Sequence, residues 1–188
     1  GLIRDMKLLL DTCVLYPTVM REMLIGAART GAYTPLWSDR ILEEWRRAAL
    51  KLGPEGAAQA EAEVALIRAA WPQAVVPPAP GVEARLWLPD PADVHVLAAA
   101  IAGHADAIVT LNNKDFPRHT LAEEGLERLG PDQLLYDLWL KDNARMEALG
   151  ARVLDEANRL SGGGWEIRPL LKKARLPRLA KALASGQS

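Results

Sequence analysis

The stretch Asp90–Phe116 constrains the fold more than any other part of this sequence, because it joins two acidic residues through an apolar helix and an apolar strand. We expect the helix over about Ala92–Gly103 and the strand over Asp106–Thr110. Asp93 then lies at the start of the helix, where the helix dipole favours a carboxylate, and Asp115 lies just beyond the strand. Such a segment can bring two distant carboxylates to one edge of a sheet.

A second apolar run, Lys7–Leu10, also ends at an acidic residue, Asp11. A short apolar run bounded by polar residues predicts a buried parallel strand. Asp11 is therefore expected at the carboxyl end of the first strand, which is where open α/β sheets bind ligands.

A fourth acid is expected on a helix that begins after Ser38, a plausible N-cap, and runs to about Leu52. Both Glu43 and Glu44 lie beside the apolar face of this helix. Spacing alone does not decide which of the two points inward.

The chain as a whole alternates between strand and helix patterns, which indicates an α/β fold with a mostly parallel sheet flanked by helices. We expect Gly81–Leu88 to be irregular or a short strand. Further helices are predicted over Met20–Thr30, from Pro54 to Trp71 and from about Asp132. The other candidate strands are Tyr33–Trp37, which is ambiguous, Ala74–Val76 and Gly125–Leu129.

From about Lys141 onward the pattern becomes helical only, with a helix over Asn143–Leu160, a break at Ser161–Gly164 and a last helix over Pro169–Ala184 that is interrupted at Pro177. We predict a first domain over residues 6–138 and a helical C-terminal appendage over residues 139–188. The segment Trp165–Ser188 has one acid, Glu166, against six basic residues: Arg168, Lys172, Lys173, Arg175, Arg178 and Lys181. This is either a solvated helix face or a surface that binds RNA or a partner.

Composition narrows the class of protein. The net charge of −1 gives no global field of the kind that marks a nucleic-acid binder. A single cysteine, Cys13, excludes an intramolecular disulfide and fits a reducing compartment. We find no apolar run of membrane-spanning length, and Gly1–Asp5 has no basic region followed by an apolar core of the secretory type. We therefore expect a cytoplasmic protein without a membrane span.

The acidic residues Asp11, Asp93 and Asp115, with Glu44 as the fourth, form a candidate divalent-metal site. Hard oxygen ligands with open positions suit Mg²⁺ or Mn²⁺. Hydrolysis of a phosphodiester by metal-activated water is chemistry that such a site supports. Like charges at this spacing repel one another without a cation, which raises carboxyl pKa values.

Four stretches of the sequence, taken in order, resemble the PIN-domain family of metal-dependent ribonucleases, which includes the VapC toxins. Together they cover roughly residues 6–135 in the right order. The stretches are LLLDTCVLYP at Leu8–Pro17, WSDRILEEWRR at Trp37–Arg47, DPADVHVLAAAIAGHADAIVT at Asp90–Thr110 and NNKDF at Asn112–Phe116.

This resemblance implies a three-layer sandwich with a parallel sheet and metal-binding acids at its carboxyl edge. Asp11, Glu44 and Asp93 match three acidic positions of the family. Many members have a fourth acid two residues after the threonine, and here that position is Asn112. Either Asp115 takes its place, or Asn112 contacts the substrate or the acids.

We also assign expected roles to other polar and aromatic residues, and for some of them the sequence leaves two roles open. Thr12 and Thr110 either hydrogen-bond the acids or close a turn. Cys13 is expected to be a small buried residue without nucleophilic chemistry. His95, two residues beyond Asp93 on the expected helix, is expected to point elsewhere. Trp165 is expected to pack in the core, with base stacking as the alternative.

The resemblance implies a metal-dependent endoribonuclease, the toxin of a type II toxin–antitoxin system. It would act on RNA, be restrained by an antitoxin and form a homodimer. The alternative is a degenerate, non-catalytic RNA-binding module, which Asn112 favours. A phosphatase of the haloacid dehalogenase type needs a second aspartate where this chain has Cys13. A dinucleotide-binding domain needs a glycine-rich loop after the first strand, and none follows it.

Overall fold

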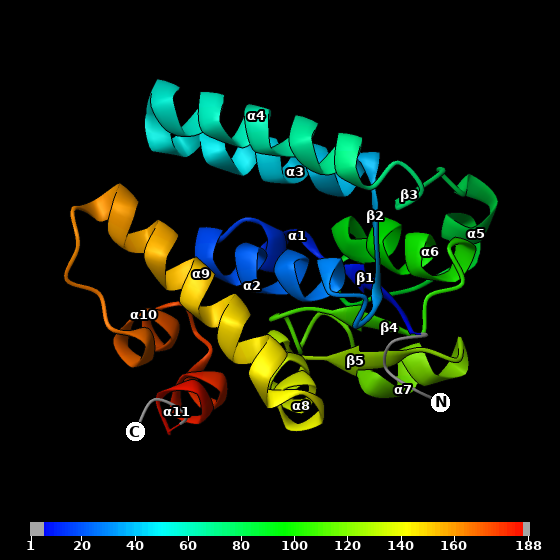
Figure 1. Ribbon diagram of the computed structural model, residues 1–188. Coiled ribbons are helices and arrows are strands. Elements are labelled where there is room, and N and C mark those ends of the chain that lie inside the picture. The colour runs from blue at the N-terminus through cyan, green and yellow to red at the C-terminus, as the bar shows by residue number, and fades with distance from the viewer. Residues whose placement is uncertain (1–5, 186–188) are drawn as a thin grey trace. The chain divides into compact units, whose positions relative to one another are not determined.

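A five-stranded parallel sheet forms the centre of the fold, with the strand order β3-β2-β1-β4-β5 (Figure 1). The computed structural model describes residues 6–185, so the expectation about Gly1–Asp5 lies outside the described residues. The strands are β1 (Lys7–Leu10), β2 (Thr34–Ser38), β3 (Val75–Val76), β4 (Ala107–Val109) and β5 (Glu127–Leu129). The predicted α/β class with helices flanking a parallel sheet is confirmed.

Strand β1 lies in the middle of this sheet, between β2 and β4. Leu9 pairs with Leu36 of β2 and with Ile108 of β4 in parallel register. Its three leucines are fully buried, as expected for an apolar run covered on both faces. The side chain that follows β1 is therefore held at the centre of the carboxyl edge.

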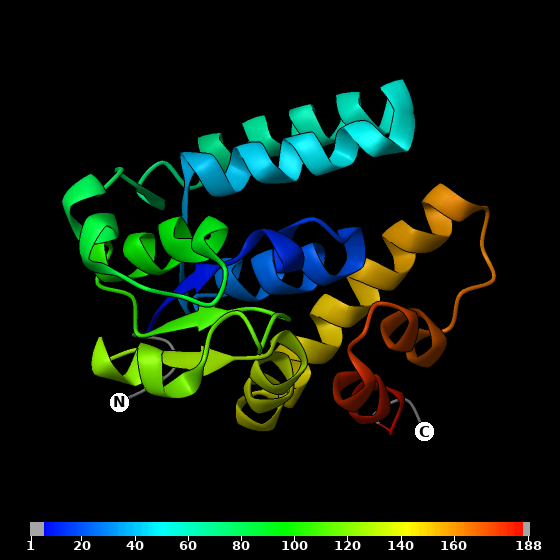
Figure 2. The ribbon, with the colours of Figure 1, turned by 180° about the vertical axis from the view of Figure 1, so that it is seen from behind.

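Several helices belong to the same compact unit as the sheet, which comprises residues 6–16 and 34–128. Helix α6 packs against β1, β2 and β4, and helix α3 packs against β2. Helices α3 and α4 lie side by side in both ribbon views (Figures 1 and 2). The helices of this unit are α1 (Thr12–Leu15), α3 (Asp39–Ala49), η2 (Leu50–Leu52), α4 (Gly53–Ala70), α5 (Pro80–Arg85), η3 (Pro91–Asp93), α6 (Val94–Ala102) and α7 (Arg118–Glu123).

Two short helices differ from the sequence-based expectation. Gly81–Leu88 was predicted to be irregular or a short strand, but its first five residues belong to helix α5, which ends at Arg85. This helix packs against α6, and Arg85 forms a 2.6 Å ion pair with Glu124. Helix α7 was not predicted. Helices this short are marginal by local propensity, so tertiary contacts stabilise them.

A second compact unit contains residues 17–33 and 129–185 and is entirely helical apart from the end of β5. The predicted break in the last part of the chain is confirmed, because Gly162, Gly163 and Gly164 all have positive φ angles. The division at residues 138 and 139 stays a prediction. The helices of this unit are α2 (Thr18–Arg29), α8 (Pro131–Lys141), α9 (Asn143–Ser161), α10 (Ile167–Lys173) and α11 (Pro177–Ser185).

Close approaches at glycine hold α9 within this unit. A Cβ atom added at Gly26 of α2 would collide with the side chain of Leu149, and one added at Gly150 would lie 2.7 Å from Leu183 of α11. The N-terminus of α11 is fixed on α8, because the Asp132 carboxylate accepts hydrogen bonds from the backbone N–H groups of Arg178 and Leu179 at 2.9 and 3.0 Å. The C-terminal helices therefore form a packed frame.

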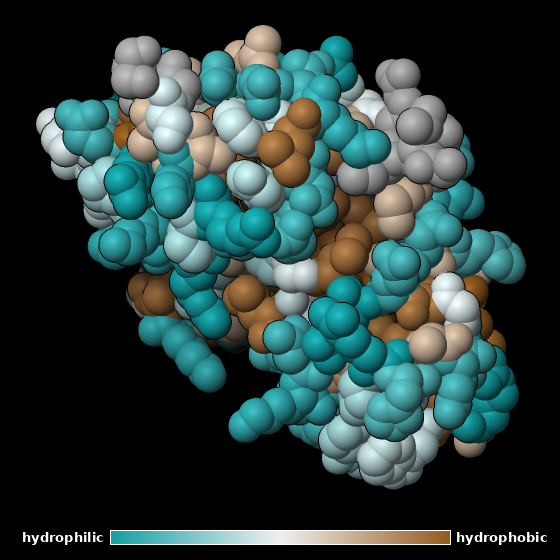
Figure 3. All heavy atoms as spheres, turned by 90° about the horizontal axis from the view of Figure 1, so that it is seen from below, coloured by the Kyte–Doolittle hydropathy of each residue, from teal (hydrophilic) through white to brown (hydrophobic). Residues whose placement is uncertain are grey.

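Hydrophilic side chains cover most of the face seen in the space-filling view, with smaller hydrophobic patches between them (Figure 3). Within residues 6–185, no helix is both long enough and apolar enough to cross a membrane.

Candidate active site

Asp11 lies at the carboxyl end of β1, as predicted, and is only 5% exposed. Its backbone N–H donates to the carbonyl of Val109 at 3.1 Å, which extends the pairing of β1 with β4 by one residue. Its backbone is extended, and Oδ1 accepts a 2.8 Å hydrogen bond from the N–H of Thr12, so Asp11 also caps helix α1. Strand and helix together fix this carboxylate.

The second carboxylate oxygen of Asp11 is held by two side chains. Thr110, fully buried just past β4, donates from Oγ1 to Asp11 Oδ2 at 2.9 Å, and the Cys13 thiol donates to the same oxygen at 3.3 Å. Thr110 Oγ1 in turn accepts from the N–H of Asn112 at 3.0 Å, and Cys13 Sγ accepts from that of Leu111 at 3.3 Å. The loop after β4 is thereby tied to Asp11.

These contacts define the roles of Cys13 and Thr12. Burial, followed by the charge of Asp11, raises the pKa of the Cys13 thiol to about 12. The thiol therefore stays protonated at neutral pH and acts as a donor, in line with the expectation that it is no nucleophile. Thr12 does not bind the acid through its hydroxyl, which donates to the carbonyl of Ile41 at 3.1 Å and so links Asp11 to helix α3.

Asp11, Asp93 and Asp115 interact electrostatically. The pKa of Asp93 is raised to about 6, chiefly by burial and then by the charges of Asp115, Asp11 and Asp90 in that order, against a lowering effect of His95. Burial likewise raises the pKa of Asp11, with a further increase from the charge of Glu44, against the lowering effect of its hydrogen bonds to Thr110, Cys13 and Thr12. The carboxylates are thus close enough to repel one another.

Asp93 and Asp115 are held differently from Asp11. Asp93 ends η3 and begins α6, but its side chain makes no capping hydrogen bond. The capping role falls to Asp90, whose Oδ1 accepts from the N–H of Ala92 at 2.9 Å. Asp115 is partly buried, and its N–H donates to the carbonyl of Asn112 at 3.1 Å within a turn, whereas Asn112 is exposed. Asp115, not Asn112, adds a charge beside Asp93.

The structure distinguishes Glu44 from Glu43 on helix α3. Glu43 accepts hydrogen bonds from Arg46 and Arg47 on its own helix, and these bonds, chiefly that from Arg46, lower its pKa to about 2. Glu44 instead lies on the side of Asp11, whose pKa its charge raises. Its Oε1 is 2.8 Å from Nε2 of His95. Helix α3 is capped as predicted, since Ser38 Oγ accepts from the N–H of Ile41 at 3.1 Å.

His95 corrects a sequence-based expectation, because it lies beside the acids instead of pointing elsewhere. It is 7% exposed. Neither ring nitrogen makes a hydrogen bond of good geometry with the described residues, although Nε2 lies 2.8 Å from Oε1 of Glu44. The expectation treated Asp93 and His95 as neighbours on one α-helix, whereas Asp93 belongs to the preceding 3-10 turn. No sequence signal indicated this contact.

The donor chemistry of the site fits a hard divalent cation, since carboxylates from β1, α3, η3 and the loop after β4 supply oxygen ligands and mutual repulsion. They do not form a closed ligand set. Within residues 6–185, no three histidine, cysteine or acidic side chains are grouped so that they could hold a metal ion. Asp11 also has both oxygens engaged by donors of the chain itself.

A parallel α/β sheet with mutually repelling carboxylates at its carboxyl edge places charged side chains where sheets of this class bind ligands. A family model described as the PIN domain matches residues 7–114, which is more than half of the chain. The chain belongs to the PIN-domain family. Proteins of this family are generally metal-dependent nucleases, which supports a hydrolase of the nuclease type. The match ends one residue before Asp115.

Searches of curated proteins and of solved structures each found no significant match to this chain.

Proposed function

We propose that this protein is an Mg²⁺- or Mn²⁺-dependent endoribonuclease whose site comprises Asp11, Glu44, Asp93 and Asp115. The observation that supports it most directly is the electrostatic coupling of Asp93 to Asp115 and Asp11 at the edge of the sheet. Such repulsion between buried Asp11 and partly buried Asp93 and Asp115 is costly in a structural role, whereas a bound divalent cation would offset it.

The residues of the chain have distinct parts in this proposal. Asp11 is fixed by Thr110, Cys13 and the Thr12 N–H, so it offers a carboxylate whose position does not depend on a bound ion. Asp93 and Asp115 add negative charge from a helix start and a turn. A divalent cation held by these carboxylates would neutralise their charge and would supply activated water and charge stabilisation for the hydrolysis of a phosphodiester.

Cleavage of a labelled, structured RNA in Mg²⁺ and in EDTA tests the proposal, with Asp11→Asn and Asp93→Asn beside the wild type. We expect cleavage in Mg²⁺ only, and its loss by at least about a hundredfold in both variants, as is usual when charge stabilisation at the reacting centre is removed. Cleavage that persists in EDTA and in both variants would refute the mechanism.

A second candidate is a degenerate PIN module that binds RNA without cleaving it. Two observations favour it: Asn112 stands where many relatives have an acid, and the described residues contain no closed group of metal ligands. Calorimetric titration with Mn²⁺ separates the two candidates. Binding that Asp93→Asn abolishes supports the nuclease, and the absence of binding supports the degenerate module.

We further propose, on the resemblance to VapC toxins, that the chain is the toxin of a type II toxin–antitoxin system, that it forms a homodimer and that a cognate antitoxin restrains it in the cytoplasm. Induced expression should arrest growth, and Asp93→Asn should relieve the arrest. A short DNA-binding reading frame next to the gene is the expected source of the antitoxin. A harmless wild-type protein would contradict the toxin role.

A further inference from the structure

All charged residues of helices α10 and α11 are basic. Between residues 167 and 185 there is no acidic residue and there are six basic ones, the "basic surface" of Arg168, Lys172, Lys173, Arg175, Arg178 and Lys181, all exposed. The whole chain has 23 basic and 24 acidic residues, so this positive charge is local. We propose that the basic surface binds the phosphate backbone of an RNA substrate, an inference that rests on the proposed ribonuclease function.

The charges of this surface are not neutralised within the protein. In the part of the chain that the structure describes, none of the six side chains forms an ion pair with a carboxylate. Lys173 lies over the ring of Trp165, with Nζ 5.3 Å from its centroid. Arg178 lies 4.5 Å from the centroid of Tyr136 and donates to Gln133. The remaining four extend into solvent with their full charge.

The basic residues lie on or next to two helices that pack against each other, so one extended ligand can contact several of them. Arg168 and Lys172 are four residues apart on α10, so they occupy neighbouring positions on one helix face, and Arg175 lies two residues past the helix end. Helix α11, which contains Lys181, packs directly on α10 (Figures 1 and 2). These charges lie on packed elements, since Asp132 caps α11. The side-chain amide of Asn158 donates to the carbonyl of Trp165 and accepts from its N–H, which holds the loop before α10.

The chemistry of this surface favours a phosphate backbone over a protein or a membrane. The apolar faces of both helices are buried, at Leu170, Leu171, Leu179 and Leu183 among others, and every large hydrophobic residue that is strongly exposed lies outside residues 167–185. Protein interfaces are anchored by aromatic and apolar side chains and are poor in lysine. A membrane-bound helix needs an exposed apolar face. Phosphates need only exposed lysine and arginine.

The proposed contact uses the six cations and not the ring of Trp165, over one face of which Lys173 lies. The expected interaction is therefore with phosphates and not with bases, and it should show little sequence preference and a strong dependence on salt.

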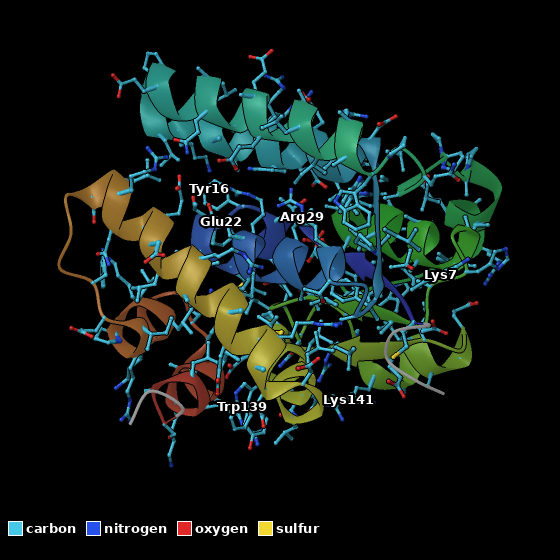
Figure 4. The ribbon with its side chains drawn as sticks, viewed as in Figure 1. Lys7, Tyr16, Glu22, Arg29, Trp139 and Lys141 are labelled. Carbon is cyan, nitrogen blue, oxygen red and sulfur yellow. The ribbon has the colours of Figure 1, made fainter. Side chains whose placement is uncertain are left out.

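The test measures the binding of a fluorescein-labelled single-stranded RNA to the full chain by anisotropy, in EDTA, over a series of salt concentrations. The test variant combines Arg168→Gln, Lys172→Gln and Arg175→Gln. The matched control combines Arg29→Gln, Lys51→Gln and Lys141→Gln, which remove the same charge from exposed side chains of other helices; Figure 4 marks Arg29 on α2 and Lys141 on α8.

We expect the test variant to lose at least about tenfold in affinity at low salt, and its log–log salt slope to fall by about 2, from about 0.7 per phosphate contact on a single strand. The control should change by less than about twofold. Equal losses in both variants, or no loss in either, overturn the proposal. So does a test variant that loses binding to polyglutamate or to anionic vesicles while RNA binding stays at the wild-type level.

Because binding is measured in EDTA, its outcome is independent of cleavage. A wild-type chain that binds RNA through this surface but does not cut it in Mg²⁺ overturns the nuclease function and supports the surface. If the test variant binds and cuts RNA as well as the wild type, the proposed role of the basic surface is overturned and the nuclease function is not.

Discussion

Replacing Asp93 by asparagine should stabilise the metal-free protein at neutral pH. The substitution keeps the shape of the side chain and removes a charge that Asp115, Asp11 and burial oppose. In the unfolded chain this carboxyl ionises near 3.8, and in the folded protein near 6. The folded state therefore loses stability as the pH rises through that window, and above it the loss is complete.

The magnitude follows from the two pKa values. The difference between 3.8 and about 6 corresponds to an upper bound of about 3 kcal/mol, at about 1.4 kcal/mol for each tenfold change in the dissociation constant. Asp93 is only partly buried, so solvent screening weakens the effect, and we expect a gain of about 1 kcal/mol in the free energy of unfolding. The gain should be present at pH 7–8 and vanish below about pH 4, where the wild-type carboxyl is also neutral.

Urea denaturation in EDTA at pH 4, 6 and 8 measures this gain, with Asp155→Asn at an exposed position of α9 as the matched control. Adding Mn²⁺ should reverse the order, because a ligand that binds only the folded state stabilises it by about 2.7 kcal/mol at a hundred times its dissociation constant. The wild type should gain this stability and Asp93→Asn should not. A variant that is less stable than the wild type at pH 8 in EDTA, or an equal gain in the control, would refute the reasoning.

Three further substitutions test the supports of the site and of the C-terminal helices. Thr110→Val should lower the free energy of unfolding by about 1–3 kcal/mol, because buried Asp11 then loses a donor; urea denaturation measures this. Glu44→Gln should weaken Mn²⁺ binding by at least about tenfold in calorimetry, while Glu43→Gln, which breaks only arginine contacts, should leave it unchanged. Asp132→Ala should cost about 1 kcal/mol through the lost cap of α11 and speed amide hydrogen exchange at residues 178–183; unchanged exchange would contradict the capping role.

Local sequence signals were sufficient where an element is determined by its own residues. The buried strand Lys7–Leu10, the cap at Ser38 and the glycine break after α9 all follow from apolar patterning, side-chain hydrogen bonding or positive φ angles. The prediction for the stretch that forms helix α5 was wrong. This helix is stabilised by contacts with α6 and with Glu124, and no local sequence pattern reveals such contacts.

In the candidate site, too, local sequence signals predict some features, and contacts between distant elements determine the others. The positions of Asp11 and Asp93 follow from where a strand ends and a helix begins, whereas Glu44 is favoured over Glu43 only by the resemblance to the PIN-domain family. The hydrogen bond from Thr110 to Asp11 joins residues 99 apart in sequence, and the approach of His95 to Glu44 joins two helices. Such contacts depend on the register between elements, which a single sequence does not specify.

The site is asymmetric in a way that explains how it can suit a cation without forming a closed ligand set. Asp11 is held by three donors from the chain itself, whereas within residues 6–185 neither Asp93 nor Asp115 accepts a hydrogen bond at its carboxylate. Repulsion separates carboxylates that nothing else constrains. Asp93 and Asp115 lie at a helix start and in a turn. In the proposed metal site, Asp11 would fix the position of a cation, and binding of that cation would relieve the repulsion that Asp93 and Asp115 contribute.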